Sequence, residues 1–195
     1  NGDYLAQALS FFGSPFTQED RLSLIGTNGA GTLDRFLQRA DPPLTREQLA
    51  RVRERLGNTY EDSPLFPQPG LREWLRELGH QGIRTGVVSS TSTKYIVTAL
   101  NRMGFTGQFQ VIVCGDMVKR PKPAPDSYQL AMSLLGLSPE ECLAIEDSPT
   151  GIQAARAAGL QVVGYKGGSV EQDTRKAHWE VRSFQEIPSL PPFRG

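Results

Sequence analysis

Short apolar runs alternate with helical segments throughout the part of the chain that follows residue 70. Apolar runs typical of strands lie at 85–89, 111–114, 143–145, 161–165 and, more weakly, 179–181. Helical patterns lie at 71–78, 93–103, 126–135 and 149–158, and a further helix start lies at 138–141. Strand–helix alternation of this kind predicts an α/β fold whose parallel sheet is covered by helices on both faces.

The segment before residue 63 has a different pattern, because every apolar repeat in it has helical spacing and it contains no convincing strand. Thr17 is placed to cap one helix, and Thr45 with Gln48 forms a capping box ahead of another. A run rich in proline, at 63–70, separates the two patterns. We therefore expect a helical domain at 1–66 and an α/β domain at 67–195.

Composition excludes several classes of function. Lys+Arg and Asp+Glu both number 21, so no basic surface for nucleic acid is expected. The apolar runs are too short to span a membrane, and no signal peptide pattern is present at the start. Cys114 and Cys142 lie in or beside apolar runs, which favours reduced, buried thiols and a cytoplasmic location.

Polar side chains follow three of the expected strands. Hydroxyl residues occupy 89–93, Lys122 stands between two prolines, and Glu146 and Asp147 follow the third strand. Ligands bind at the carboxyl ends of the strands in an open α/β sheet, so these groups should meet at one edge. Hydroxyls, helix-start amides and a lysine suit a phosphate group, and paired carboxylates suit Mg²⁺.

Each of these groups also has a purely structural interpretation. The hydroxyls at 89–93 suit helix caps, and Lys122 suits a solvated loop. Glu146 and Asp147 suit the start of a helix, where acidic side chains interact favourably with the helix dipole. The order and spacing of the three groups together favour the phosphate site.

Three strings carry a resemblance to a known family. Val-Val-Ser-Ser at 87–90, Lys-Pro-Ala-Pro-Asp at 122–126 and Ile-Glu-Asp-Ser-Pro-Thr-Gly-Ile at 145–152 resemble motifs two, three and four of the haloacid dehalogenase-like hydrolases. The closest likeness is to the branch of β-phosphoglucomutase and small sugar-phosphate phosphatases, over about residues 1–187. The resemblance implies a Rossmann-like core with a helical cap domain.

The resemblance also implies roles for individual residues. Ser89 would hydrogen-bond the transferring phosphoryl group, together with the backbone of Ser90. Lys122 would bridge the phosphate and a nucleophilic aspartate, and Glu146 and Asp147 would bind Mg²⁺. Asp126, outside the reacting groups, would position the loop of Lys122.

The family's first motif, a strand that ends in Asp-x-Asp, has no counterpart in the chain. The aspartates nearest the start follow no strand; they are Asp3, Asp20, Asp34 and Asp62. We expect the nucleophile, the acid/base and a central strand in a segment preceding Asn1; without that strand, the sheet should divide into two halves. A natural loss of the motif and a deliberately shortened chain are the alternatives.

The helical domain bears on the substrate. Its loop at 26–32 resembles the specificity loop of the mutase, which implies substrate contacts from Gly26 and Thr27, although a plain turn between helices fits equally. Gly29 aligns with the arginine that grips a second phosphate in the mutase, so a substrate with one phosphate is favoured. The domain contains no lysine for a Schiff base, and the acidic pair argues against a metal-free dehalogenase.

These observations predict a Mg²⁺-dependent phosphatase that hydrolyses a small, sugar-derived phosphomonoester through an aspartyl-phosphate. The alternatives are a mutase of the β-phosphoglucomutase type and a non-catalytic binding protein with the same fold. The expected partner is a small phosphorylated metabolite, with neither nucleic acid nor membrane involved, and the expected state is a monomer or a homodimer.

Overall fold

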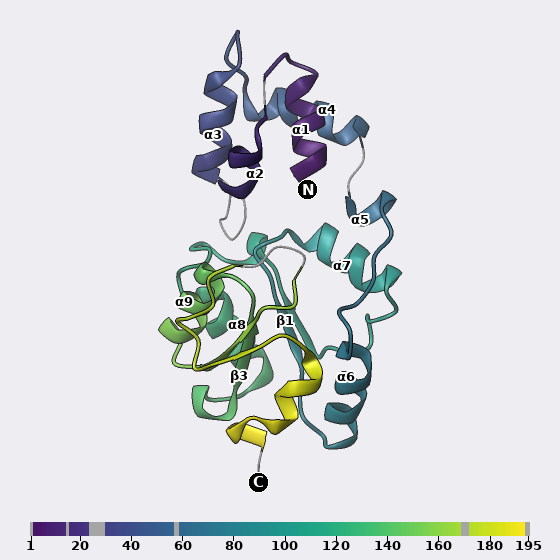
Figure 1. The fold of residues 1–195 in the computed structure, drawn as a ribbon, viewed down its shortest axis with the longest axis vertical. Coiled ribbons are helices and arrows are strands. Elements are labelled where there is room, and N and C mark those ends of the chain that lie inside the picture. Colours follow the sequence, from purple (N-terminus) through teal and green to yellow (C-terminus); the bar gives the residue numbers. More distant parts are fainter. Residues whose placement is uncertain (1, 15, 24–29, 57–58, 169–171, 194–195) are drawn as a thin grey trace. The chain divides into compact units, whose positions relative to one another are not determined.

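The computed structural model describes residues 2–14, 16–23, 30–56, 59–168 and 172–193. The chain divides into two compact units, Asn1–Pro64 and Leu65–Gly195. Figure 1 shows helices alone in the first unit and strands with helices in the second.

The Asn1–Pro64 unit consists of helices with one shared core. They are α1 (Gly2–Ser10), α2 (Gln18–Ser23), α3 (Ala30–Arg39), α4 (Arg46–Leu56) and α5 (Thr59–Asp62). The buried core contains Leu5, Ala8, Leu9, Phe36, Leu37, Ala40, Leu44 and Leu49. The absence of strands among its described residues agrees with the helical periodicity of the sequence.

Two reciprocal capping boxes begin helices in this unit. The Thr17 hydroxyl accepts a hydrogen bond from the Asp20 amide at 3.2 Å, and the Asp20 carboxylate accepts one from the Thr17 amide at 2.9 Å. The Thr45 hydroxyl accepts from the Gln48 amide at 3.2 Å, and the Gln48 side chain accepts from the Thr45 amide at 2.8 Å. Each box satisfies backbone donors that the first turn of a helix leaves free. The caps predicted at Thr17 and Thr45 are therefore confirmed.

The Leu65–Gly195 unit alternates strands and helices. Its strands are β1 (Gly86–Val88), β2 (Val111–Val113), β3 (Leu143–Glu146), β4 (Gln161–Tyr165) and β5 (Trp179–Val181). Its α-helices are α6 (Leu71–His80), α7 (Thr93–Arg102), α8 (Asp126–Leu135) and α9 (Pro149–Ala157). Its 3₁₀ turns are η1 (Gly115–Met117), η2 (Pro139–Glu141), η3 (Phe184–Ser189) and η4 (Pro191–Phe193). None of the helices that the structure describes, in either unit, has the length and apolar character needed to cross a bilayer.

The helix start expected at 138–141 is confirmed, with Ser138 as the cap and Pro139 as the first residue of a 3₁₀ turn. Glu141 does reach back to the Ser138 amide, at 2.9 Å, as its spacing predicts. The segment makes the short 3₁₀ turn η2, and Cys142 leads from it into β3. A capping box satisfies the first free amides, but it does not lengthen a helix when the following residues pair with another strand.

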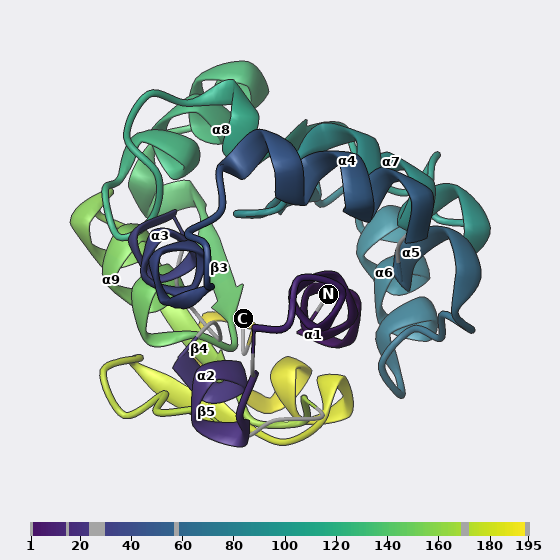
Figure 2. The same cartoon turned by 90° about the horizontal axis from the view of Figure 1, so that it is seen from above.

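The strands form two parallel sheets that helices cover on both sides. β1 pairs with β2, with Val87 opposite Ile112, whereas β3, β4 and β5 form the second sheet in that order. Helices α6 and α7 pack on one face of β1–β2 and α8 on the other, while α9 packs on β3 and β4. Figure 2 shows α6 and α7 on one side of the strands and α8 and α9 on the other.

One cavity lies between the two sheets. It has a volume of about 550 Å³, and among its lining residues are Gly86, Val88, Leu143, Ala144 and Ile145. Within the described part of the chain, β1 pairs only with β2, and β3 pairs only with β4. Both strands therefore have one edge without a strand partner beside the cavity. The division of the sheet into halves agrees with the sequence prediction.

The two cysteines are free thiols, as predicted. Cys114, directly after β2, is buried, and Cys142, directly before β3, is half-buried. Loss of hydration raises the pKa of both thiols, so they remain protonated near neutral pH.

Asp20 gives the first testable prediction. Its carboxylate accepts two hydrogen bonds from Arg39, at 3.0 and 2.8 Å. These two bonds, together with the hydrogen bond from the Thr17 amide, lower the pKa of Asp20 to about 2. The pKa of an aspartate in the unfolded chain is about 3.9. Because the folded-state pKa is lower, the charged carboxylate stabilises the folded state fully above the unfolded pKa, and this contribution is lost as the pH falls through about 2. Asp20→Asn should therefore destabilise the protein at neutral pH, and the difference should shrink steadily below about pH 4.

Urea unfolding followed by circular dichroism, at a series of pH values, measures this difference. The exposed pair Arg46–Asp34 provides the control, because Asp34→Asn breaks a pair in which both side chains are more than half exposed. A difference for Asp20→Asn that stays constant from neutral pH to about pH 2 would contradict the interpretation.

Candidate active site

Lys122 is buried at the junction of the two sheets. Its side chain is only 7% exposed. This burial excludes the alternative interpretation of Lys122 as a solvated lysine in a loop. The ammonium group donates a hydrogen bond to the carbonyl oxygen of Val88 at 3.0 Å and forms an ion pair with Oε1 of Glu146. Val88 ends β1 and Glu146 ends β3, so one side chain joins the carboxyl ends of both strands.

The Glu146 carboxylate is also buried and has three side-chain donors. Oε1 accepts from Lys122 and from the hydroxyl of Tyr128, and Oε2 accepts from the Ser148 hydroxyl at 3.4 Å. A buried carboxylate is tolerated only when it is paired and hydrogen-bonded, and these donors meet that requirement. Glu146 is the last residue of β3, and its carboxylate lies against the first turn of α9, which Ser148 caps, so the helix-start interpretation and the ion pair with Lys122 both hold.

Gly151 has no side chain, and the Glu146 carboxylate occupies the space where a Cβ atom of this residue would lie. A Cβ atom at this position in α9 would overlap the carboxylate carbon and both of its oxygens. The Gly151 amide also donates to the hydroxyl of Ser148, the N-cap of α9, at 3.1 Å. The start of α9 and the carboxylate are thus fitted to each other, and only glycine is compatible with both.

Tyr128 is part of the site, although the sequence did not single it out. It lies in the first turn of α8 and is 6% exposed. Its hydroxyl donates to Glu146, and the Lys122 ammonium lies 5.0 Å from the centre of its ring. Burial and the Glu146 charge raise the pKa of Tyr128 well above its usual value, so the hydroxyl remains a donor. Its partner Glu146 lies 18 residues further along the chain, so no local pattern marked Tyr128 as a site residue.

Asp147 is exposed and has no side-chain donor among the described residues. Desolvation by the surrounding protein atoms, and then the charge of Glu146, raise the pKa of Asp147. Lys122 forms its ion pair with Glu146 and lowers the pKa of Asp147 less than desolvation and the Glu146 charge raise it, so one lysine faces two carboxylates and a cation would relieve the remaining negative charge.

These carboxylates suit part of a magnesium site. Carboxylate oxygens are the ligands that Mg²⁺ prefers, and the ion usually completes its shell with water and phosphate oxygens. Across the described ranges, no group of three His, Cys, Asp or Glu residues is placed to hold a metal. The residues present therefore fit a Mg²⁺ ion that takes its remaining ligands from elsewhere.

The segment that follows β1 presents hydroxyls at the same edge. The Ser89 amide donates to Val113 at 2.9 Å, and the Ser89 hydroxyl oxygen accepts from the Thr91 amide at 3.1 Å. This arrangement leaves the Ser89 hydroxyl hydrogen with no acceptor in the described residues. Ser90 is exposed, and its carbonyl oxygen lies so close to Gly115 that a Cβ there would overlap it.

Asp116 fixes this segment from the neighbouring loop. Its carboxylate accepts from the Thr93 amide at 3.0 Å and from the Thr93 hydroxyl at 2.8 Å. Ser92 occupies the N-cap position of α7, but its side chain makes no capping bond. The alternative that the hydroxyl residues at 89–93 act as helix caps is therefore wrong for Ser92. Sequence reasoning also missed Asp116, which performs that role from 23 residues away.

Two further predictions concern loops. Asp126 begins α8 and accepts a hydrogen bond from Arg120 at 2.9 Å, which joins the two ends of the loop that carries Lys122.

Gly26 and Thr27, predicted to contact the substrate, lie outside the described residues. The structure therefore brings together Lys122 and Glu146, with Ser89 adjoining the Val88 carbonyl that Lys122 contacts.

The comparisons with known proteins agree with this arrangement. The sequence profile of the haloacid dehalogenase-like hydrolases matches residues 4–165. Protein CbbY of Rhodobacter capsulatus is 31% identical, over 98% of this chain and 89% of that protein. A phosphoglycolate phosphatase of Photorhabdus laumondii is 33% identical, over 85% of this chain and 73% of that protein.

A crystal structure of CbbY from Rhodobacter sphaeroides, in complex with phosphate, has a TM-score of 0.83 and 28% identity. The similarity covers 95% of this chain and 88% of that one. The chain therefore belongs to the haloacid dehalogenase-like hydrolases, and within them to the phosphoric monoester hydrolases. The α/β fold class and the family resemblance predicted from the sequence are both confirmed.

Gly151 gives the second testable prediction. Gly151→Ala should lower the free energy of unfolding by about 1–3 kcal/mol, because the three donors hold the Glu146 carboxylate where the new methyl group would lie. Gly79→Ala is the matched control: Gly79 is also helical and has open space around its Cβ position. That change should leave stability equal or raise it by up to about 1 kcal/mol. Equal unfolding midpoints in urea for the two variants would contradict the packing argument.

Proposed function

We propose that the protein is a Mg²⁺-dependent phosphatase that hydrolyses a small, sugar-derived phosphomonoester. The observation that carries the proposal is the buried junction of Lys122 and Glu146 at the carboxyl ends of β1 and β3, next to the Ser89 loop. In this proposal, Lys122 offsets the charge of the phosphoryl oxygens. The Ser89 hydroxyl and the Ser90 backbone donate hydrogen bonds to those oxygens.

The proposed nucleophile is an aspartate in a segment that precedes Asn1. The two strand edges without partners beside the 550 Å³ cavity support this part of the proposal. An extended segment between β1 and β3 would pair with both edges and would present its carboxyl end beside Lys122. A carboxylate at that end would attack phosphorus and form an aspartyl-phosphate, while the acid/base expected in the same segment gives a proton to the departing alcohol oxygen. The same group would then take a proton from the water that hydrolyses the intermediate.

The proposed metal ligands in this chain are Glu146 and Asp147. The raised pKa of Asp147 and its lack of a side-chain donor in the described structure support this choice. When bound, Mg²⁺ would offset charge on the phosphoryl oxygens and the two carboxylates together. Lys122 would provide the fixed positive charge on the other side of Glu146.

The substrate class rests on the relatives and on the loop at 26–32. The Photorhabdus relative is named for phosphoglycolate, which carries one phosphate. CbbY of Rhodobacter sphaeroides has been crystallised with xylulose-1,5-bisphosphate, which carries two. Gly29, in place of an arginine, favours a single phosphate. The helical unit would act as a cap domain, with Gly26 and Thr27 beside the substrate, and the cytoplasm is the proposed location.

A panel of phosphate esters tests this function directly. The protein from the complete reading frame should release phosphate in the presence of Mg²⁺ from sugar monophosphates or phosphoglycolate, faster than from bisphosphates. Removal of Mg²⁺ with a chelator should abolish the release, and added Mg²⁺ should restore it. No turnover across the panel would contradict the proposed activity and favour a non-catalytic role, and an isomerised product would favour a mutase.

Lys122→Met tests the site assignment. Methionine keeps the apolar stem but removes the charge, so turnover should fall by about a hundredfold to a thousandfold, as it does when a fixed charge-stabilising donor is lost. Circular dichroism checks that the variant is folded. Lys119→Met, an exposed lysine of the same loop, should retain activity within about twofold. Equal turnover for Lys122→Met and the parent would exclude Lys122 from the reaction.

A further inference from the structure

Glu146 Oε1 accepts hydrogen bonds from two donors of different kinds. One is the Lys122 ammonium, which carries a positive charge, and the other is the neutral hydroxyl of Tyr128. The remaining oxygen, Oε2, has the longer bond from Ser148 at 3.4 Å. Tyr128 is thus the uncharged close partner of a carboxylate that is only 7% exposed.

The proposed function places competing demands on Lys122. The ammonium group is held by Glu146 and Val88, yet it must also reach the phosphoryl oxygens. If Lys122 turns toward a phosphate, Glu146 loses its ion pair while it is still buried. Glu146 would then keep only neutral donors, from Tyr128 and Ser148, and the loss of its one charged donor would count against phosphate binding.

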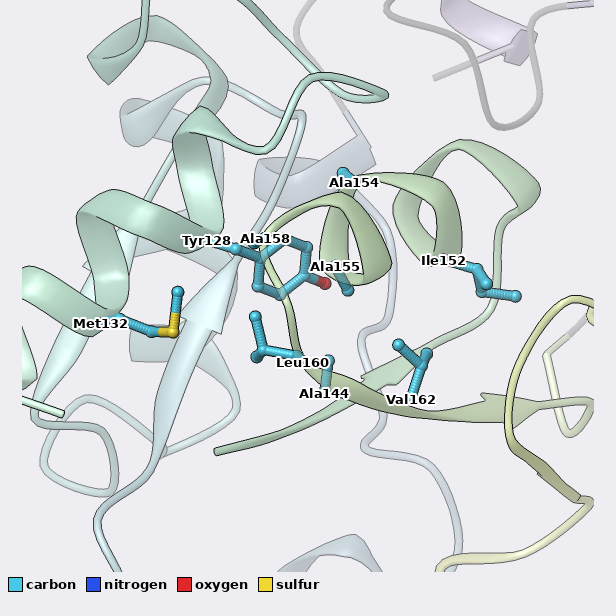
Figure 3. Packing of buried hydrophobic residues seen from close by; sticks show 9 residues of the cluster. All are labelled: Tyr128, Met132, Ala144, Ile152, Ala154, Ala155, Ala158, Leu160 and Val162. Carbon is cyan, nitrogen blue, oxygen red and sulfur yellow. The ribbon is translucent and has the colours of Figure 1, made fainter. Parts of the chain in front are cut away.

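Tyr128 is fixed in a position that reduces this cost. Its ring is packed in the core cluster formed by α8, α9, β3 and β4, in which Met132, Ala144 and Ala155 are also buried. Figure 3 shows the ring among these residues. Because the ring is only 6% exposed and is held in this cluster, its hydroxyl is expected to stay beside Glu146 when Lys122 moves. The ring also lies 5.0 Å from the ammonium group and offers it a favourable π face.

We propose that Tyr128 is a positioning residue: its hydroxyl keeps Glu146 hydrogen-bonded while Lys122 turns from Glu146 to the phosphoryl group. This inference rests on the proposed function, because it assumes that Lys122 binds phosphate. It assigns Tyr128 no contact with the substrate. Its effect on catalysis passes entirely through Glu146 and Lys122.

Tyr128→Phe tests the inference, because it removes the hydroxyl and keeps the ring. Inorganic phosphate is the probe, and its affinity for the protein from the complete reading frame is measured by calorimetry with Mg²⁺ present. Phosphate affinity should fall by about tenfold or more, the factor that corresponds to one hydrogen bond to a charged group. KM for the best ester of the panel should rise with it.

Tyr165→Phe is the matched control. Tyr165 is buried to the same degree, and its hydroxyl donates to the uncharged Gln68 side chain at 3.2 Å. This variant should bind phosphate as the parent does. Equal losses of phosphate affinity in the two tyrosine variants would show a general packing effect and would overturn the inference.

A second measurement separates positioning from packing. In a Glu146→Gln background the ammonium group is no longer held by an ion pair, so adding Tyr128→Phe should change phosphate affinity by less than about twofold. A loss as large as in the parent background would mean that Tyr128 acts independently of Glu146, against the proposal.

Phosphate binding also distinguishes failure of this inference from failure of the proposed function. If the parent binds phosphate in a Lys122-dependent way but hydrolyses no ester, only the phosphatase activity is excluded. If Tyr128→Phe binds phosphate as tightly as an active parent, only the role of Tyr128 is excluded. A parent that binds no phosphate would overturn both.

Discussion

The buried ion pair between Lys122 and Glu146 is the interaction on which the site depends. It joins a loop after β2 to the end of β3, and the hydrogen bond to the Val88 carbonyl adds the end of β1. A pair of this kind does not by itself guarantee stability, because both charges lose their hydration. Its value here is geometric: Tyr128, Ser148 and the absence of a side chain at Gly151 all fix where the carboxylate lies.

The two sheets explain why these groups meet. Parallel strands direct their carboxyl ends to one edge, so residues far apart in sequence become neighbours without any long-range signal in the sequence. The cavity between β1 and β3 lies beside the same junction, because Val88 both lines it and accepts from Lys122. A carboxylate nucleophile supplied between these strands would therefore arrive next to the one buried lysine of the described core.

Much of this arrangement could be predicted from the sequence. Local patterns predict the strand–helix alternation and the capping boxes at Thr17 and Thr45. They also place Lys122 in the loop after β2 and Glu146 at the end of β3. Tyr128 and Asp116 could not be found in this way, because their roles depend on partners 18 and 23 residues away. The extent of η2 also depended on tertiary structure, since pairing of β3 with β4 ends the turn that Ser138 begins.

We propose that this chain supplies the lysine, the hydroxyl and part of the metal site, and that a carboxylate preceding Asn1 accepts the phosphoryl group. Mass spectrometry of the protein from the complete reading frame, acid-quenched during turnover, tests this claim most directly. The account predicts an acid-stable, hydroxylamine-labile phosphoryl group on an aspartate in the segment before Asn1. A phosphoryl group on Ser89 or on any other residue of the chain would contradict it.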